Sequence, residues 1–86
     1  MTTSLQTRTF LRDLLIEQLA CEAHAVVPSA TLRDLGADSL DLVEIVMRLE
    51  QELLIDISDK DVASLEKQGG DITVQQILDY LQTRTA

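Results

Sequence analysis

Ser39 is the residue whose type and position in this sequence could support chemistry. It follows Gly36-Ala37-Asp38 and precedes a stretch, residues 40–54, that contains no Gly or Pro. Asp is favoured immediately before a helix, so we expect a helix to begin at Asp38-Ser39. A serine there presents its hydroxyl at the positive end of the helix dipole, where a phosphate group is tolerated. A serine at a helix start also commonly serves only as part of the cap, so the spacing alone leaves both interpretations open.

Other reactive side chains do not form a site in the sequence. The only histidine, His24, lies three residues from the only cysteine, Cys21, and far from Ser39, so we expect no catalytic Ser-His-Asp or Cys-His arrangement. A single cysteine excludes an intrachain disulfide and a cysteine-rich zinc site. The acidic run from Asp59 does not fit a calcium loop, because Ser64 stands where that loop needs glycine. We therefore expect no metal site, and structural roles for His24 and Cys21.

Composition narrows the possible functions. The 86 residues include 7 Lys+Arg and 15 Asp+Glu, a formal net charge of −8, and only two aromatic side chains, Phe10 and Tyr80. Nucleic acid binding needs a positive field and stacking platforms, so we exclude it. A chain of this size buries only about 60–65% of its unfolded surface, which argues against an enclosed catalytic pocket. No apolar run exceeds three residues, so we expect no membrane span or secretory segment. From its length we expect a single domain over residues 1–86, as a monomer, and the single cysteine fits the reducing cytoplasm.

The negative charge is concentrated in the middle of the chain. Residues 38–61 carry eight acidic side chains and two basic ones. Such a field steers encounters with basic partner surfaces, and salt weakens it. The alternative is that the acids form a solvated face without a partner.

The elements that must position Ser39 follow from hydrophobic spacing and capping signals. Thr3-x-x-Gln6 fits a capping box and predicts that a first helix begins at Thr3. We expect this helix to end near Glu22 or Ala23. Its core-facing residues are Leu11, Leu14, Leu15 and Leu19. The segment 26–38 contains Pro28 and Gly36 and is predicted to be a long loop, attached to the core by Leu32 and Leu35.

The second helix, from Ser39 through Leu54, is predicted to be amphipathic with an unusually wide apolar arc. Its inward residues are predicted to be Leu42, Val46, Leu49 and Leu53, and its polar stripe Asp41, Glu44, Arg48, Gln51 and Glu52. Leu40 and Met47 lie beside this stripe. They either remain partly exposed as a docking surface or pack on the neighbouring loop.

Two further helices complete the predicted fold. Ser58-x-x-Asp61 opens a short helix of about two turns that Gly69-Gly70 must end. Thr73 and Gln76 form a capping box for the last helix, whose apolar face is Val74, Ile77, Leu78 and Leu81, with Ile72 placed to pack against Ile77. The prediction is an all-α, four-helix bundle of three longer helices and one short helix.

At its central motif the sequence resembles the freestanding acyl carrier proteins. The motif Leu35-Gly36-Ala37-Asp38-Ser39-Leu40, followed by Asp41, Val43, Glu44, Val46, Met47, Leu49 and Glu50, is similar to that family's modification site and recognition helix, and the likeness extends from about Leu11 to Tyr80. The resemblance implies that a phosphopantetheinyl transferase moves 4′-phosphopantetheine from coenzyme A to Ser39, beside Asp38 and Leu40. The arm's thiol then carries acyl groups as thioesters, sheltered between the helices, and the protein itself is not an enzyme.

The resemblance also implies which partners meet the second helix. Acyl-processing enzymes such as a ketosynthase, a malonyl transferase or another acyltransferase would bring basic and apolar patches, in fatty acid, specialised lipid or polyketide-like biosynthesis. The residues expected to meet them are Asp38, Leu40, Asp41, Glu44, Met47, Arg48 and Glu50.

Two departures from the family pattern leave alternatives open. Arg48 is positive where the family commonly has a small or neutral residue, and it either pairs with Glu44 and Glu52 in its own helix or alters partner choice. The segment 62–71 is several residues longer than the family's connection.

A peptidyl or aminoacyl carrier is an alternative function, although such carriers commonly have a second glycine where Ala37 stands. A helical interaction protein without a prosthetic group is the other.

Overall fold

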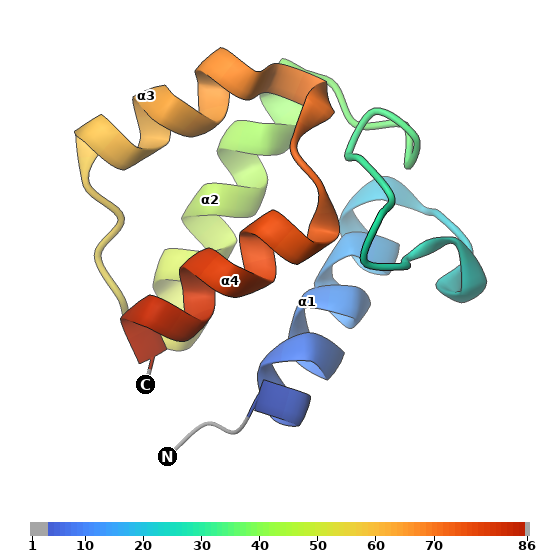
Figure 1. Ribbon diagram of the computed structural model, residues 1–86, viewed down its shortest axis with the longest axis horizontal. Helices are drawn as coiled ribbons and strands as arrows, with labels where there is room; N and C mark the ends of the chain where they lie inside the picture. The colour runs from blue at the N-terminus through green and yellow to red at the C-terminus, as the bar shows by residue number, and fades with distance from the viewer. Residues whose placement is uncertain (1–3, 86) are drawn as a thin grey trace.

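Four amphipathic α-helices form among residues 4–85, the part of the chain that the computed structural model describes (Figure 1). They are α1 (Ser4–Leu19), α2 (Ser39–Leu53), α3 (Asp59–Gln68) and α4 (Val74–Thr85), with short 3₁₀ helices at Ala23–Ala25 (η1) and Gly69–Asp71 (η2). Over these residues there is no β-strand, only an isolated antiparallel bridge between Thr31 and Thr73. The predicted all-α bundle is confirmed.

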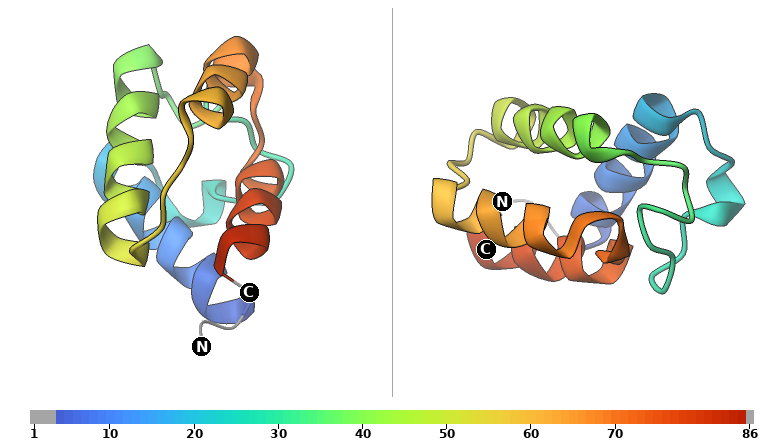
Figure 2. Two further views of the ribbon diagram at one scale, coloured as in Figure 1. Left: turned by 90° about the vertical axis from the view of Figure 1, so that its left-hand side faces the viewer. Right: turned by 90° about the horizontal axis from the view of Figure 1, so that it is seen from above.

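The hydrophobic core lies between α1, α2 and α4, and the α1–α2 and α3–α4 connections close it (Figure 2). Its buried residues are Leu11, Leu14, Leu15, Ala30, Leu32, Leu35, Leu42, Ile45, Val46, Leu49, Ile57, Ile72, Val74, Ile77, Leu78 and Leu81. The predicted inward residues Leu19 and Leu53 are only partly buried, whereas Ile45, absent from the predicted set, is 1% exposed. α3 has no fully buried residue and packs on the core through the partly buried Val62 and Leu65.

The first helix ends earlier than predicted. The expected capping box at Thr3 lies outside the described residues, and α1 stops at Leu19 instead of near Glu22 or Ala23. Ala20 takes a left-handed backbone conformation (φ 53°), which ends a helix and is usually taken by glycine. The Cys21 Sγ then donates a hydrogen bond to the carbonyl of Leu15 at 3.7 Å. The chain therefore turns away one helical turn early.

The predicted caps of the last two helices are confirmed. The backbone N–H of Asp61 donates to the hydroxyl of Ser58 at 3.1 Å. The N–H of Gln76 donates to Thr73 Oγ1 at 3.1 Å, and the N–H of Thr73 donates to Gln76 Oε1 at 2.8 Å, so both halves of the capping box form. α3 runs for ten residues, longer than the two turns expected, and ends directly before Gly69.

The long α1–α2 loop is tied to the segment between α3 and α4. The N–H of Leu32 donates to the carbonyl of Ile72 at 3.0 Å, and the N–H of Arg33 donates to the carbonyl of Gly70 at 2.9 Å. A Cβ atom on Gly70 would lie 3.0 Å from the Cβ of Arg33, closer than ordinary contact allows. The glycine in the long 62–71 segment thus permits this close approach of two backbones.

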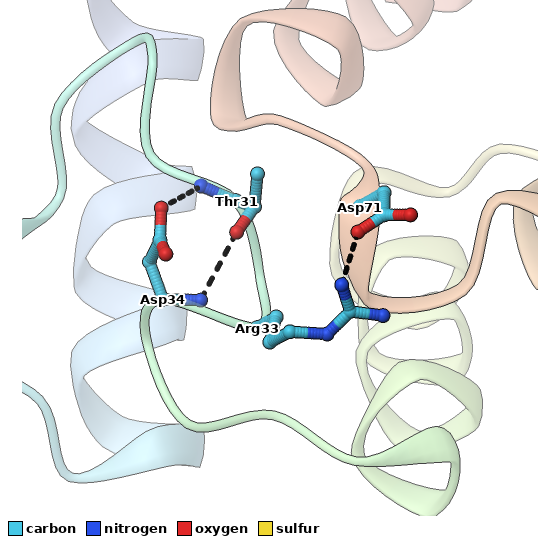
Figure 3. A network of polar contacts seen from close by, with 4 residues as sticks. All are labelled: Thr31, Arg33, Asp34 and Asp71. Carbon is cyan, nitrogen blue, oxygen red and sulfur yellow. Dashed lines mark hydrogen bonds and ion pairs between the residues drawn. The ribbon is translucent and has the colours of Figure 1, made fainter.

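Polar side chains reinforce the same junction (Figure 3). Thr31 and Asp34 exchange hydrogen bonds between backbone N–H groups and side-chain oxygens, at 3.1 and 3.0 Å. Arg33 forms an ion pair with Asp71 across the junction. The bonds between Thr31 and Asp34 stabilise a turn within the loop, and the Arg33–Asp71 pair ties that turn to the segment between α3 and α4.

Candidate functional site

The start of α2 is fixed by a reciprocal pair of aspartates. Asp38 is the N-cap residue, and its Oδ1 accepts a hydrogen bond from the N–H of Asp41 at 2.9 Å. Asp41 Oδ2 in turn accepts from the N–H of Asp38 at 3.0 Å. The predicted cap at Asp38 is confirmed. The second half of the box was not predicted, because Asp41 stands where the usual pattern has Glu or Gln.

Ser39 is the first residue of α2 and is exposed to solvent. Asp38 supplies the cap, and the Ser39 hydroxyl makes no hydrogen bond to any residue in the range 4–85. The hydroxyl therefore stands free at the end of α2 where the unpaired N–H groups give a partial positive charge. Gly36 (φ 89°) provides the left-handed turn that brings the chain to this point, with nothing within 4 Å of where its Cβ would be.

A cavity of about 610 Å³ adjoins Ser39, between the start of α2 and the end of α3. Its lining is apolar along Leu32, Leu42 and Val43 and charged at Arg33, Asp38 and Glu66, with Ala37, Leu40, Gly69 and Gly70 completing it. This volume lies within the range of small-molecule sites. The length of the chain argued against an enclosed cavity. The observed cavity is open at the surface and is formed by the α1–α2 loop, α2 and the Gly69-Gly70 turn.

The outer face of α2 carries an exposed apolar row that begins beside Ser39. Leu40 is 64% exposed, Val43 39% and Met47 52%, and their spacing places them on one side of the helix. Of the two alternatives left open for Leu40 and Met47, the structure shows the exposed one, and Val43 joins them. An exposed apolar row next to acidic side chains is typical of a docking surface.

The polar stripe of α2 is turned towards α1. Gln18 donates a hydrogen bond to Glu44, and Arg48 pairs with Glu17 at 3.4 Å and with Glu52 at 4.0 Å. The predicted pairing of Arg48 with Glu52 is found, but its other partner is Glu17 of α1 rather than Glu44. Helical spacing could not reveal this, because it says nothing of the neighbouring helix. The Arg48 side chain is only 27% exposed.

Glu50 lies on the opposite edge of α2, next to the connection to α3. It is half-buried, and its Oε2 accepts a hydrogen bond from the N–H of Ile57 at 3.1 Å. Glu50 was expected at the partner surface. In the structure it orders the α2–α3 connection.

The remaining candidate residues are scattered. Within the described part of the chain, no group of three or more His, Cys, Asp or Glu side chains is placed to hold a metal ion. Cys21 is half-buried and His24 is exposed on η1. None of the described helices is both long and apolar enough to cross a membrane.

Comparisons with known proteins agree with this geometry. Residues 9–81 match a protein family described as a phosphopantetheine attachment site. An acyl carrier protein of Campylobacter concisus is 37% identical over 73 residues, covering 84% of this chain and 87% of that protein. An acyl carrier protein of Bdellovibrio bacteriovorus is 39% identical over 75 residues, covering 86% of this chain and 88% of that protein.

Proposed function

The chain belongs to the acyl carrier protein family, and from that premise we propose that its 4′-phosphopantetheine group is attached to Ser39. When bound, this group holds acyl intermediates as thioesters on its terminal thiol. One observation carries the assignment to Ser39: its hydroxyl is exposed at the first position of α2 and is not used by the helix cap.

The surroundings of Ser39 fit a phosphodiester and the arm beyond it. The free N–H groups at the start of α2 favour a negatively charged phosphate. The carboxylates of Asp38 and Asp41 are both engaged with backbone N–H groups. The adjoining cavity combines an apolar lining with a polar rim, which suits an arm that alternates aliphatic and amide groups.

A phosphopantetheinyl transferase is the partner that would modify Ser39. The Ser39 oxygen forms a bond to the phosphorus of the 4′-phosphopantetheine group of coenzyme A, and the bond from that phosphorus to adenosine 3′,5′-bisphosphate breaks. The hydroxyl proton passes to a base of the transferase. This chain supplies only the acceptor hydroxyl, consistent with a carrier that is not itself an enzyme.

The outer face of α2 is the proposed surface for acyl-processing enzymes. Leu40, Val43 and Met47 offer a shallow apolar contact, and Asp38 and Asp41 place negative charge beside it. Exposed ion pairs contribute little, about 0–1 kcal/mol each, which suits brief contacts with successive partners. Partners with basic and apolar patches, such as a ketosynthase, a malonyl transferase or another acyltransferase, fit this surface.

Two other residues of the expected partner surface contribute at its edges. Glu44 and Arg48 lie on the α1 side and interact with Gln18 and Glu17, respectively.

Fatty acid, specialised lipid and polyketide-like pathways all remain compatible with the surface. A cytoplasmic location and a monomeric state stay predictions.

Intact mass spectrometry tests the attachment. The purified protein is incubated with coenzyme A and a broad-specificity phosphopantetheinyl transferase, and we expect the mass of one phosphopantetheine group to be added. Ser39→Ala should remain unmodified and folded, and Ser64→Ala, on the exposed face of α3, is the matched control that should be modified like the wild type. Modification of Ser39→Ala, or none of the wild type with an active transferase, would contradict the proposal.

The cargo separates an acyl carrier from the peptidyl or aminoacyl alternative. Protein purified from its native host without reducing or hydrolytic treatment retains the thioester, so its intact mass reports the attached group. An acyl mass supports the proposal, and an amino acid mass supports the alternative. A bare polypeptide from the native host would favour an interaction protein without a prosthetic group.

A further inference from the structure

A second cavity, of about 320 Å³, lies on the side of the bundle formed by α1, η1 and the start of α4. Its rim carries Arg8, Arg12 and His24. Its apolar wall consists of Ala23, Val26, Val27, Pro28, Val74 and Leu78, and Thr9 adds a hydroxyl. Its lining includes no Asp or Glu, although the whole chain carries a net charge of −8.

One of the two arginines of this rim is unpaired. The chain has only seven Lys and Arg, and two of them line this one cavity. Arg12 pairs with Asp13 at 3.2 Å. Arg8 and His24 have no ion pair or side-chain hydrogen bond to any residue within 4–85. An unpaired guanidinium beside an apolar wall leaves both charge and apolar surface available to a ligand.

This cavity is separated from the acidic face of α2. At 100° per residue, Arg8 and Arg12 lie about 180° and 140° around α1 from Glu17, which pairs with Arg48 of α2. In Figure 1, η1 and α2 accordingly lie on opposite sides of α1. The molecule measures 29 × 27 × 20 Å, whereas charges are screened over about 8 Å at physiological ionic strength. An anion at this rim is therefore governed by the local arginines.

We propose that this cavity binds a small amphipathic anion, a carboxylate on a short aliphatic chain. The carboxylate meets the guanidinium groups of Arg8 and Arg12, whose planar forks match its geometry. The aliphatic chain contacts the wall of Val26, Val27 and Leu78. The volume is at the low end of small-molecule sites, which favours a short chain over a long one.

The proposal is independent of the role of Ser39. The free acid released when an acyl thioester is hydrolysed belongs to the same chemical class and is one source of such a ligand. Binding itself requires only the rim and the wall. Wild type and Ser39→Ala are therefore expected to bind alike, and a failure of the attachment proposal would leave this site untouched.

Backbone amide chemical shifts of the full ¹⁵N-labelled chain, titrated with sodium octanoate, test the site. We expect saturable shifts confined to residues 8–12, 23–28 and 74–78. Octan-1-ol has a similar chain without the charge, and sodium acetate has the charge without the chain. Octan-1-ol should bind about threefold to tenfold more weakly than octanoate, because it lacks the charged contact. Acetate should bind more than about tenfold more weakly, because it lacks six methylene groups that would contact the apolar wall. Equal shifts with octan-1-ol, or no saturation with octanoate, would overturn the proposal.

Two variants assign the binding to the rim. Arg8→Gln removes the unpaired guanidinium and should weaken octanoate binding about threefold to tenfold. Lys67→Gln removes one positive charge from an exposed position of α3 that lines neither this cavity nor the one at Ser39, and should bind octanoate as the wild type does. Circular dichroism checks that both are folded. An equal loss in both variants would reduce the effect to overall charge, and no loss in Arg8→Gln would refute the assignment.

Discussion

Asp38 links the fold to the proposed attachment site, because the same carboxylate caps α2 and adjoins Ser39. Asp38→Ala removes the hydrogen bond from the N–H of Asp41 at 2.9 Å. Loss of an N-cap side chain costs about 0.5–2 kcal/mol, and the buried Leu42 and Ile45 hold the following turns in place. We therefore expect fraying of the first turn only and a loss of about 1 kcal/mol. In a domain of this size that lowers the midpoint of thermal unfolding by about 4–8 °C.

Asp38→Asn is the matched control, because Asn caps a helix as well as Asp but carries no charge. Urea unfolding followed by circular dichroism should place Asp38→Asn close to the wild type and Asp38→Ala about 1 kcal/mol below it. The rate of coenzyme A-dependent modification of Ser39 is the second readout. This rate should fall for Asp38→Ala, because the first turn frays. If Asp38→Asn is modified more slowly than the wild type at low salt but equally fast at high salt, the transferase recognises the charge of Asp38. If Asp38→Ala were as stable as the wild type, the capping argument would be refuted.

Three further substitutions test other contacts. Tyr80→Phe removes a hydrogen bond to α3 and should cost about 0.5–1.5 kcal/mol. Burial and this bond raise the pKa of Tyr80, so the wild type should lose stability as the pH rises through that pKa, above about 10, while Tyr80→Phe should not; urea unfolding at two pH values checks both. Gly70→Ala would crowd the Cβ of Arg33 at 3.0 Å, and Arg33 is tethered there by its N–H bond to the Gly70 carbonyl, so we expect a loss of stability of up to about 1 kcal/mol, measured by thermal unfolding. Arg48→Ala should cost about 0.2–1 kcal/mol, and a double-mutant cycle with Glu17→Gln that shows no coupling would mean the inter-helix pair is not stabilising.

Several local features of the fold could be predicted from residues close in sequence. The box of Thr73 and Gln76 and the cap of Ser58 involve partners three residues apart, and the structure contains both. The end of α1 was not predictable. A left-handed Ala20 ends it, whereas sequence patterns signal such a stop through Gly or Pro. The Leu pattern itself ends at Leu19, and residues 20–23 contain no Gly or Pro that would indicate the turn.

In the candidate site, too, some features could be predicted from the sequence and others could not. The position of Ser39 at a helix start could be predicted from its neighbours Gly36 and Asp38, and the structure confirms it. Its role as the attachment site follows from the family resemblance and stays a prediction. The partners of Arg48 and Glu50 could not, because each contacts a segment that only the packing of α2 brings near. Sequence spacing assigns a helix face, but the rotation of that helix against α1 and α3 decides which polar residues remain available to a partner.

That rotation concentrates the available negative charge at the Ser39 end of the proposed partner surface. Asp38 and Asp41 accept backbone hydrogen bonds, yet a carboxylate that accepts N–H groups keeps its charge, so capping and steering are compatible. Steering acts over about 8 Å, whereas capping requires contact. Farther along α2, Arg48 offsets neighbouring acids and Glu50 faces the α3 connection. We therefore expect a basic partner patch to be drawn towards the end of the helix where the arm is proposed to be attached, before the apolar contacts form.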